Sequence, residues 1–179
     1  MRIKLFLLIL VLLGTVALPS FTRGSDTEQD PESTTTMGIT RTQLILFAKQ
    51  FLGTPYHFAS SSPKKGFDCS GFVKYVFNNF KISLPHASRE FDKLGTALKP
   101  EDFKVGDVII FYGFKDKSKI GHVGIICEAD GMKSKFIHSS SGKVHAVTIS
   151  DLGSGMYTRR FYKCIDVFNE GLAGSLADQ

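Results

Sequence analysis

Several patterns that carry chemistry in other proteins are missing from this 179-residue chain. It has no tryptophan and only three cysteines, and its glycines do not have the spacing of a phosphate-binding loop. Neither zinc-knuckle spacing nor a basic stripe with interleaved aromatic residues occurs, so the sequence does not support nucleotide or nucleic-acid binding. The length leaves room for one ordinary domain. We expect it to have no cofactor, no resident metal and no nucleic-acid partner.

The first 17 residues (MRIKLFLLILVLLGTVA) have two early cations, an apolar run from Leu5 to Leu13 and a small-residue ending. This pattern is typical of a secretory signal peptide. The apolar run is short for a membrane span, and no cysteine near the expected cleavage point could be acylated. We therefore expect an exported, monomeric protein of the periplasm or the extracellular space, without a stable membrane anchor. An uncleaved N-terminal anchor is the alternative.

Residues 18–37 are rich in Ser, Thr, Asp, Glu and Gln, which predicts a disordered tether. We place the folded domain at residues 38–170 and a flexible tail at residues 171–179. Loss of the signal peptide removes Arg2 and Lys4 and no acid, so the formal net charge of +5 becomes 5 − 2 = +3. This small basic excess suits a polyanionic surface such as a cell wall, although it is mainly a solubility feature.

Apolar spacing predicts helices in the first half of the domain and strands in the second half. The expected helices are residues 40–52 with Thr40 as N-cap, residues 71–80, and a shorter one at residues 88–94. The expected strands are residues 105–113, 120–128, 134–139, 144–149 and 160–168. Helices followed by strands favour an α+β fold in which N-terminal helices pack on an antiparallel sheet of five to six strands.

A cysteine precedes the second of these helices. The Cys69 thiol would face the unpaired N–H groups and the positive end of the helix dipole. Such surroundings favour the thiolate, and with help from a histidine they lower a cysteine pKa from about 8.5 to roughly 3.5–7.5. Cys69 would then be a nucleophile. The alternative is a small buried hydrophobe that closes the start of the helix, which is the commoner role of a lone cysteine.

Two histidines favour the nucleophile. His122 and His138 lie in strands on either side of Asp130-Gly131, a strong hairpin signal. A turn centred near Asp130 gives cross-strand partners whose numbers sum to about 260, and 122 + 138 = 260. The two imidazoles should therefore be neighbours on one face, with Cβ atoms roughly 4.5–5.5 Å apart. Each histidine alone would be an ordinary structural residue, but with Cys69 they fit a nucleophile, its base and an orienting group.

The two remaining cysteines lie in predicted strands. Cys127 and Cys164 would form a disulfide if their strands were neighbours, which would leave Cys69 free. Equally, both would be buried thiols. The sequence leaves these alternatives open.

Residues 39–168 resemble the NlpC family of papain-like bacterial cell-wall peptidases. The shared features are the Tyr56 loop with Ser62-Pro63, the block 66–71 (GFDCSG), Leu84-Pro85 followed by Ser88, Gly106-Asp107, residues 121–125 (GHVGI) and residues 136–138 (FIH). The resemblance implies that Cys69 is the nucleophile, His122 the base and His138 the residue that orients the base. It also implies cleavage of peptide bonds in murein stem peptides, commonly the bond between D-glutamate and the following diamino acid.

The resemblance further implies an active-site role for Tyr56, whose hydroxyl would assist the oxyanion. Asp68, Ser70 and Ser88 would lie near the substrate, in some members gripping a free N-terminal amine. The local sequence allows plainer roles as well. Tyr56 would be a packing residue, Asp68 a helix N-cap, Ser70 a first-turn hydroxyl and Ser88 the cap of the next helix.

The chain departs from the family pattern at two places. The family follows its loop tyrosine with Trp-Gly-Gly two residues on, whereas residues 56–60 read YHFAS, so we expect a different path for this loop. His86 replaces the arginine that is common after Leu-Pro. Both changes concern substrate choice more than the reaction.

Three alternatives to hydrolysis remain at this point. The same fold could bind murein peptides without cutting them, although Cys69, His122 and His138 are all present. A metal site could form from these three residues and Asp68. An amine could replace water as the acyl acceptor in an amide acyltransferase. We assign no catalytic role to the other three histidines, which lie in loops or beside turns.

Overall fold

Helix α1 (Arg41–Lys49) opens the part of the chain that this computed structural model describes, residues 40–168. A capping box fixes its start, because the Thr40 hydroxyl accepts the Gln43 N–H at 3.1 Å and the Gln43 side chain accepts the Thr40 N–H at 2.9 Å. Thr40 is therefore the N-cap, as predicted, although the helix ends three residues earlier than expected. The predicted signal peptide, tether and tail lie outside the described residues. Within those residues, no helix is long and apolar enough to cross a membrane.

Helix α2 (Cys69–Asn79) follows a small hairpin of β1 (Ser61–Ser62) and β2 (Gly66–Phe67) that the sequence had indicated only as a loop. The helix begins two residues before the predicted start. Asp68 explains this, because its Oδ1 accepts the Gly71 N–H at 2.6 Å and so caps the helix ahead of Cys69. Of the two roles considered for Asp68, the helix cap is therefore present.

Two short 3₁₀ helices lead to the sheet, η1 (Ser88–Lys93) and η2 (Pro100–Asp102). The first confirms the expected short helix in this region. Its N-cap is Ala87, with no side-chain cap, so the prediction that Ser88 caps this helix is wrong. Ser88 is instead the first residue of η1.

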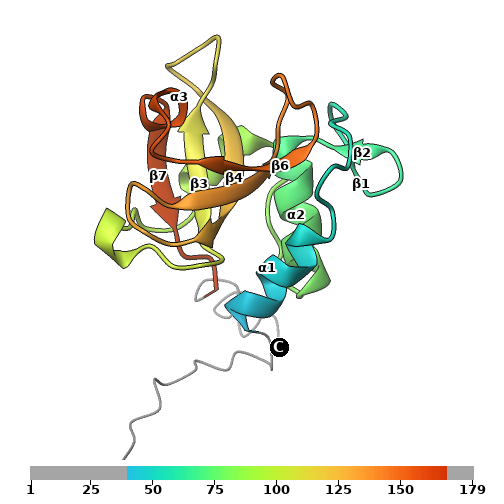
Figure 1. The fold of residues 1–179 in the computed structure, drawn as a ribbon, viewed down its shortest axis with the longest axis horizontal. Coiled ribbons are helices and arrows are strands. Elements are labelled where there is room, and N and C mark those ends of the chain that lie inside the picture. The colour runs from blue at the N-terminus through green and yellow to red at the C-terminus, as the bar shows by residue number, and fades with distance from the viewer. Residues whose placement is uncertain (1–39, 169–179) are drawn as a thin grey trace, which may run out of the picture. The chain divides into compact units, whose positions relative to one another are not determined.

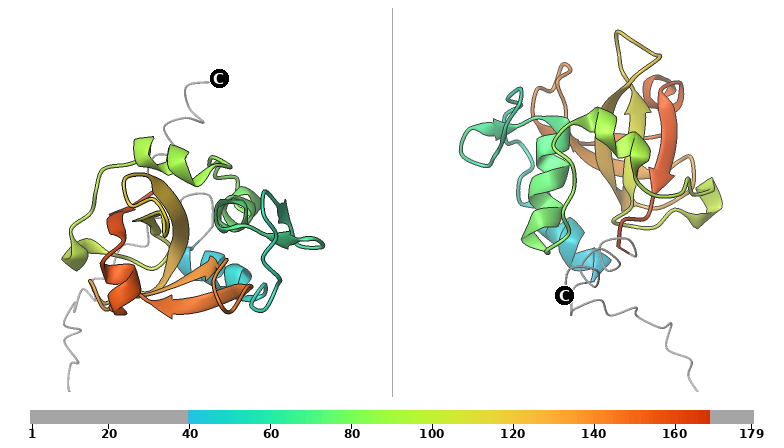
Figure 2. Two further views of the ribbon diagram at one scale, coloured as in Figure 1. Left: turned by 90° about the horizontal axis from the view of Figure 1, so that it is seen from above. Right: turned by 180° about the vertical axis from the view of Figure 1, so that it is seen from behind.

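Five antiparallel strands form the main sheet: β3 (Val108–Tyr112), β4 (Ile120–Glu128), β5 (Lys135–Ser139), β6 (Val147–Asp151) and β7 (Phe161–Ile165). Their spatial order is β6-β5-β4-β3-β7 (Figure 1). The α+β prediction is thus confirmed. A short helix that the sequence analysis missed, α3 (Gly155–Thr158), precedes β7. The turned views show α1 and α2 together beside the sheet (Figure 2).

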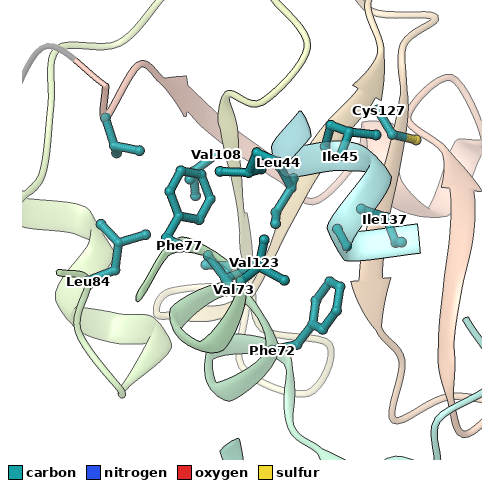
Figure 3. Packing of buried hydrophobic residues seen from close by; sticks show 14 of the residues in the cluster. Leu44, Ile45, Phe72, Val73, Phe77, Leu84, Val108, Val123, Cys127 and Ile137 are labelled. Atoms are coloured by element: carbon teal, nitrogen blue, oxygen red, sulfur yellow. The ribbon is translucent and has the colours of Figure 1, made fainter. Parts of the chain in front are cut away.

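The sheet separates two apolar clusters. On one side, Val123, Ile125 and Cys127 of β4 belong to the large core that also holds the buried faces of α1 and α2 (Figure 3). Ile126 of the same strand belongs to a smaller cluster. His122 has the parity of Ile126, so alternation along the strand directs its side chain to the face of the smaller cluster.

The predicted pairing of the histidine strands is wrong by two residues. Ile125 pairs with Ile137 and Ile126 with Phe136, so partner numbers sum to 262. Continuing this register puts Gly124, rather than His122, opposite His138. The cause is the connection, residues 129–134, which is centred later in the chain than Asp130, together with a bulge between Ile126 and Glu128. A Cβ at Gly124 would lie 3.2 Å from the His138 Cβ, so glycine leaves space at this position.

Cys127 and Cys164 do not pair. β3 separates their strands, and the two residues belong to clusters on opposite faces of the sheet. All three cysteines are free thiols. Of the two alternatives that the sequence left open, the structure therefore has the buried thiols.

Gly71 is required where the loop before α2 crosses the helix start. A Cβ at this position would lie 2.2 Å from the Ser60 carbonyl oxygen and 2.9 Å from Asp68 Oδ1. We predict that Gly71→Ala lowers the free energy of unfolding by about 1–3 kcal/mol, because the loop or the cap must move. Thermal and denaturant unfolding measure this change.

Gly142→Ala is the matched control. Its Cβ would meet only the Ser140 hydroxyl, at 3.4 Å, and its φ is not in the left-handed region. We expect a melting temperature close to that of the unchanged protein for Gly142→Ala. Equal stability of the two variants would contradict the packing argument.

Candidate active site

The start of α2 presents the Cys69 side chain at the edge of a cleft. Cys69 is the first residue of the helix and is half-buried. Two hydrogen bonds hold the segment that precedes Cys69. The Asp68 N–H donates to the Ser60 carbonyl oxygen at 2.9 Å, and the Ser60 hydroxyl donates to the Gly66 carbonyl oxygen at 2.7 Å. The backbone N–H of Val123 is near enough to the thiol to lower its pKa. The thiol therefore lies beside β4, one residue from His122.

A second hydrogen bond joins the cysteine segment to the histidine strand. The Ser139 hydroxyl, fully buried, donates to the Phe67 carbonyl oxygen at 2.7 Å. Ser139 follows His138 in β5, and Phe67 lies two residues before Cys69. This bond restricts the separation of nucleophile and histidines, and the sequence contained no signal for it.

The two histidines make direct contact despite the shifted register. His122 Nε2 lies 2.8 Å from His138 Nδ1, and the rings meet edge to face with centroids 4.8 Å apart. The predicted neighbourhood is thus confirmed, although the pair is diagonal rather than directly opposite. Because Nε2 of His122 is engaged, its Nδ1 is the nitrogen left to exchange a proton.

Both imidazoles are neutral near pH 7. Burial lowers the pKa of His122 well below its usual value, and His138 and Arg160 lower it further. Burial lowers the pKa of His138 to about 4, with an additional contribution from Arg160. A neutral His138 can accept a hydrogen bond at Nδ1, so it can support a charged His122 without adding a like charge.

The thiol differs from the sequence expectation. Burial raises the pKa of Cys69 to about 11, and the neighbouring Asp68 carboxylate raises it as well. Backbone N–H groups of Val123, Ser70 and Cys69 lower it, but they do not outweigh desolvation. The prediction that the helix mouth lowers this pKa is therefore wrong. The resting site holds a thiol and a neutral imidazole.

The cleft beside Cys69 has a volume of about 820 Å³. Its lining includes every residue that the family resemblance placed near the substrate, namely Tyr56, Asp68, Ser70 and Ser88, together with Cys69. His122 and His138 are not among the lining residues and are almost completely buried behind it. The cleft therefore exposes Cys69, whereas both histidines are buried behind it.

Asp68 and Tyr56 are close enough to Cys69 to share its electrostatics. Asp68 Oδ1 accepts hydrogen bonds from the Gly71 N–H at 2.6 Å and from the Ser70 hydroxyl at 3.3 Å. Ser70 therefore supports the carboxylate of Asp68. Burial raises the pKa of Tyr56, as do the charges of Cys69 and Asp68. The Tyr56 hydroxyl consequently keeps its proton and can donate into the cleft.

The altered loop after Tyr56 carries a backbone conformation that glycine favours. Ala59 has φ +54°, in the left-handed region, at one of the two positions where the family has glycine. The loop between β5 and β6 holds Tyr56 in place. The Tyr56 N–H donates to the His145 carbonyl oxygen at 2.9 Å, and the centroids of the two rings are 5.2 Å apart. His145 thus packs against the site, and His86 lines the cleft.

The sequence analysis missed a polar group behind the histidines. His138 Nε2 lies 3.0 Å from the Ser150 hydroxyl and 3.4 Å from the Tyr157 hydroxyl. Arg160 is half-buried and influences the pKa of both imidazoles. Ser150 lies in β6 and Tyr157 in α3, both after the last family motif at residues 136–138, so only the folded arrangement could have indicated them.

Between residues 40 and 168, no three His, Cys, Asp or Glu side chains converge in a way that could hold a metal ion. The hydrogen bond between the imidazoles also engages one nitrogen of each ring. The metal-site alternative therefore lacks a ligand set in this region.

Comparisons with known proteins agree on one family. The sequence pattern of the NlpC/P60 family matches residues 53–166. Gamma-DL-glutamyl hydrolase of Bacillus subtilis is 33% identical over 149 residues, which cover 81% of this chain and 32% of that protein. Gamma-D-glutamyl-L-lysine dipeptidyl-peptidase of Bacillus cereus is 33% identical over 118 residues, covering 66% of this chain and 34% of that protein. The chain thus spans about a third of the length of these relatives.

A crystal structure supports the same relationship. An NlpC/P60 family protein from Bacillus cereus superposes with a TM-score of 0.64 at 30% sequence identity. The match covers 72% of this chain and 40% of that one.

The charge of Asp68 should control the reactivity of Cys69. In Asp68→Asn the amide oxygen can still accept the Gly71 N–H, but the negative charge is lost. We predict that the pKa of Cys69 falls from about 11 and that alkylation by iodoacetamide at pH 8 becomes faster. Peptide mapping should find the label on Cys69 before Cys127 and Cys164, which are 6% and 0% exposed.

Asp102→Asn, at an exposed carboxylate of η2, is the control and should alkylate at the original rate. A rate for Asp68→Asn equal to or below that of the unchanged protein would contradict the electrostatic account. So would initial labelling of Cys127 or Cys164.

Proposed function

The chain belongs to the NlpC/P60 family, and from this premise we propose that it is a cysteine endopeptidase that hydrolyses peptide bonds in peptidoglycan stem peptides. Its preferred target is the bond between D-glutamate and the following diamino acid, in cell-wall remodelling or recycling. One observation carries the proposal. A cysteine at a helix start opens onto a cleft, and a hydrogen-bonded pair of neutral imidazoles is buried behind it.

The reaction starts from the thiol. His122 accepts the Cys69 proton at Nδ1, and the sulfur attacks the substrate carbonyl carbon to form a C–S bond. The resulting imidazolium donates from Nε2 to His138. Because burial opposes both charges, we place proton transfer together with attack rather than before it.

Different groups serve the oxyanion and the leaving group. The backbone N–H of Cys69 and the Tyr56 hydroxyl donate to the oxyanion, and a single such donor is typically worth about 2.7–4 kcal/mol. His122 then returns its proton to the leaving nitrogen as the C–N bond breaks. Water, deprotonated by His122, hydrolyses the thioester and frees the thiol.

Asp68 gives the substrate a part in activating the enzyme. A free N-terminal amine, as an ammonium group, would pair with the carboxylate in the cleft. That pairing would offset the negative charge that raises the pKa of Cys69. The same contact would therefore position the peptide and make the thiol easier to deprotonate.

The charges of the cleft suit a γ-linked glutamyl residue. A glutamate joined through its side chain keeps a free α-carboxylate, and Arg89 and Lys119 both line the cleft that contains Asp68. Cations and a carboxylate are thus available for the two charged ends of a stem peptide. The names of the two Bacillus relatives describe γ-glutamyl bonds, and one describes a dipeptidyl-peptidase.

The two other functions make different predictions. A binding module needs no nucleophile, yet Cys69, His122 and His138 are all present and connected in this chain. An acyltransferase would release a product joined to an amine rather than a free carboxylate. Mass analysis of fragments from a defined stem peptide separates hydrolysis from acyl transfer.

Alanine substitution of the two histidines should reduce turnover to different extents. We predict that His122→Ala abolishes turnover, because no other group in the site can take the thiol proton. His138→Ala should keep measurable activity, because His138 only positions the base. Steady-state rates on a stem tripeptide, with circular dichroism to check the fold, measure the difference.

His57→Ala is the control, since His57 is exposed and does not line the cleft. It should retain the original rate. Full activity of His122→Ala would overturn the proposed mechanism.

The amine contact should be visible in substrate preference. We predict that a stem peptide with a free N-terminal L-alanine is cut faster than its acetylated form, since acetylation leaves Asp68, 8% exposed, without a cation. The loss of such a pair is worth about 2–5 kcal/mol when it is fully desolvated. Competition between the two peptides gives the ratio of kcat/KM.

Asp68→Asn should bring this ratio close to one, because neither peptide then meets a carboxylate that distinguishes a free amine from an acetylated one. If the unchanged protein already cuts both peptides equally, amine recognition is rejected while the Cys69 chemistry stands. In that case the enzyme would act on stems that are still part of the wall.

A further inference from the structure

We propose that Ser150 and Tyr157 are positioning residues that set the tautomer of His138 and, through it, the tautomer of His122. The inference rests on the proposed cysteine hydrolysis and names two residues that decide whether the base is ready. Both follow the last matched motif, and both lie behind the histidines rather than in the cleft.

The hydrogen-bonded chain has four members. His122 Nε2 contacts His138 Nδ1 at 2.8 Å, and His138 Nε2 contacts the Ser150 hydroxyl at 3.0 Å. The Tyr157 hydroxyl lies 3.4 Å from the same nitrogen, and the Ser150 and Ser140 side chains both act on its pKa. His138 is fully buried and Tyr157 is 7% exposed, so these side chains depend on one another for hydrogen bonds.

Two proton arrangements satisfy the imidazole pair, but only one gives a working base. If His138 carries its proton on Nε2, its Nδ1 accepts from His122 Nε2–H, and His122 Nδ1 is free to take the thiol proton. If His138 carries its proton on Nδ1, it donates to His122 Nε2. The proton of neutral His122 is then on Nδ1, and that nitrogen cannot accept another.

The neighbours of His138 favour the working arrangement. We assign the Ser150 hydroxyl, 3.0 Å from His138 Nε2, the role of acceptor, with its own proton directed toward Tyr157. In that role it requires a proton on Nε2. Ser150, at 3.0 Å, is closer than Tyr157, so it is the acceptor and Tyr157 fixes its orientation.

Packing holds this group in place. The Tyr157 ring contacts Phe111 and Phe136, with centroid distances of 5.3 Å and 4.8 Å, and it also contacts both imidazoles. The ionisable groups around the histidines are Cys69 from α2, Tyr157 from α3 and Arg160 from the segment before β7. Burial, assisted by Arg160, keeps His138 neutral, and neutrality is what the acceptor role needs.

The test removes the acceptor and reads the tautomer directly. In Ser150→Ala, Nε2 of His138 loses its 3.0 Å partner. We expect kcat on a free stem tripeptide to fall about tenfold or more with KM within about twofold, since a wrong tautomer in a comparable triad is far more costly. Long-range ¹⁵N NMR should show His122 moving from protonation at Nε2 toward protonation at Nδ1.

Three further variants separate positioning from structure. Ser150→Thr keeps the hydroxyl and should restore both kcat and the His122 spectrum. Tyr157→Phe frees the Ser150 hydroxyl to rotate and should shift the spectrum in the same direction as Ser150→Ala. Ser154→Ala removes an exposed hydroxyl that makes no cap hydrogen bond, and it should change neither readout.

Different experimental results would contradict this inference and the proposed function. An unchanged His122 tautomer in Ser150→Ala overturns the inference, even if the unchanged protein cleaves stem peptides well. Unaltered kcat in both Ser150→Ala and Tyr157→Phe also overturns it. If the unchanged protein cuts no stem peptide, the proposed function fails, and the NMR spectra still decide the role of Ser150.

Discussion

The hydrogen bond between His122 Nε2 and His138 Nδ1 is the interaction on which the site depends. It determines which nitrogen of the base faces the chemistry. Burial of both rings keeps them neutral, and the resulting low dielectric makes their hydrogen bond worth more than it would be in water. The Ser139 bond to the Phe67 carbonyl oxygen then restricts how far the nucleophile can lie from this pair.

The same burial leaves both groups of the proposed mechanism uncharged at rest. Desolvation raises the pKa of the thiol and lowers that of the base, so both groups are neutral until a substrate changes their surroundings. Asp68 has two duties in this arrangement. Its Oδ1 fixes the start of α2, and its charge opposes the thiolate until a cation neutralises it. A peptide without such a cation would meet a less reactive enzyme.

Much of this architecture could be predicted from the sequence. Helical and strand spacing predicted the order of elements, β4 has the predicted bounds, and Thr40 is the N-cap that was expected. The motifs brought Tyr56, Asp68, Cys69, Ser70 and Ser88 to one cleft, as the family resemblance implied.

What the sequence could not predict depends on distance and burial. The hairpin register was wrong because the connection is centred later in the chain than Asp130 and is preceded by a bulge, yet Gly124 leaves space for the two rings to meet diagonally. The Cys69 pKa was misjudged because a helix dipole is a local feature, whereas desolvation requires the packed cleft. The sequence does not distinguish Ser139 and Ser150 from other serines in strands. Their hydrogen-bond partners became known only from the folded sheet.

The most direct measurement follows a γ-glutamyl stem tripeptide with a free N-terminus in water enriched in ¹⁸O. Mass spectrometry of the products gives the bond that is cut and the origin of the new oxygen. The account predicts a single cut after D-glutamate, ¹⁸O in the new carboxylate, and no products with Cys69→Ala. Cleavage by Cys69→Ala at the original rate, or an intact peptide with the unchanged protein, would contradict it.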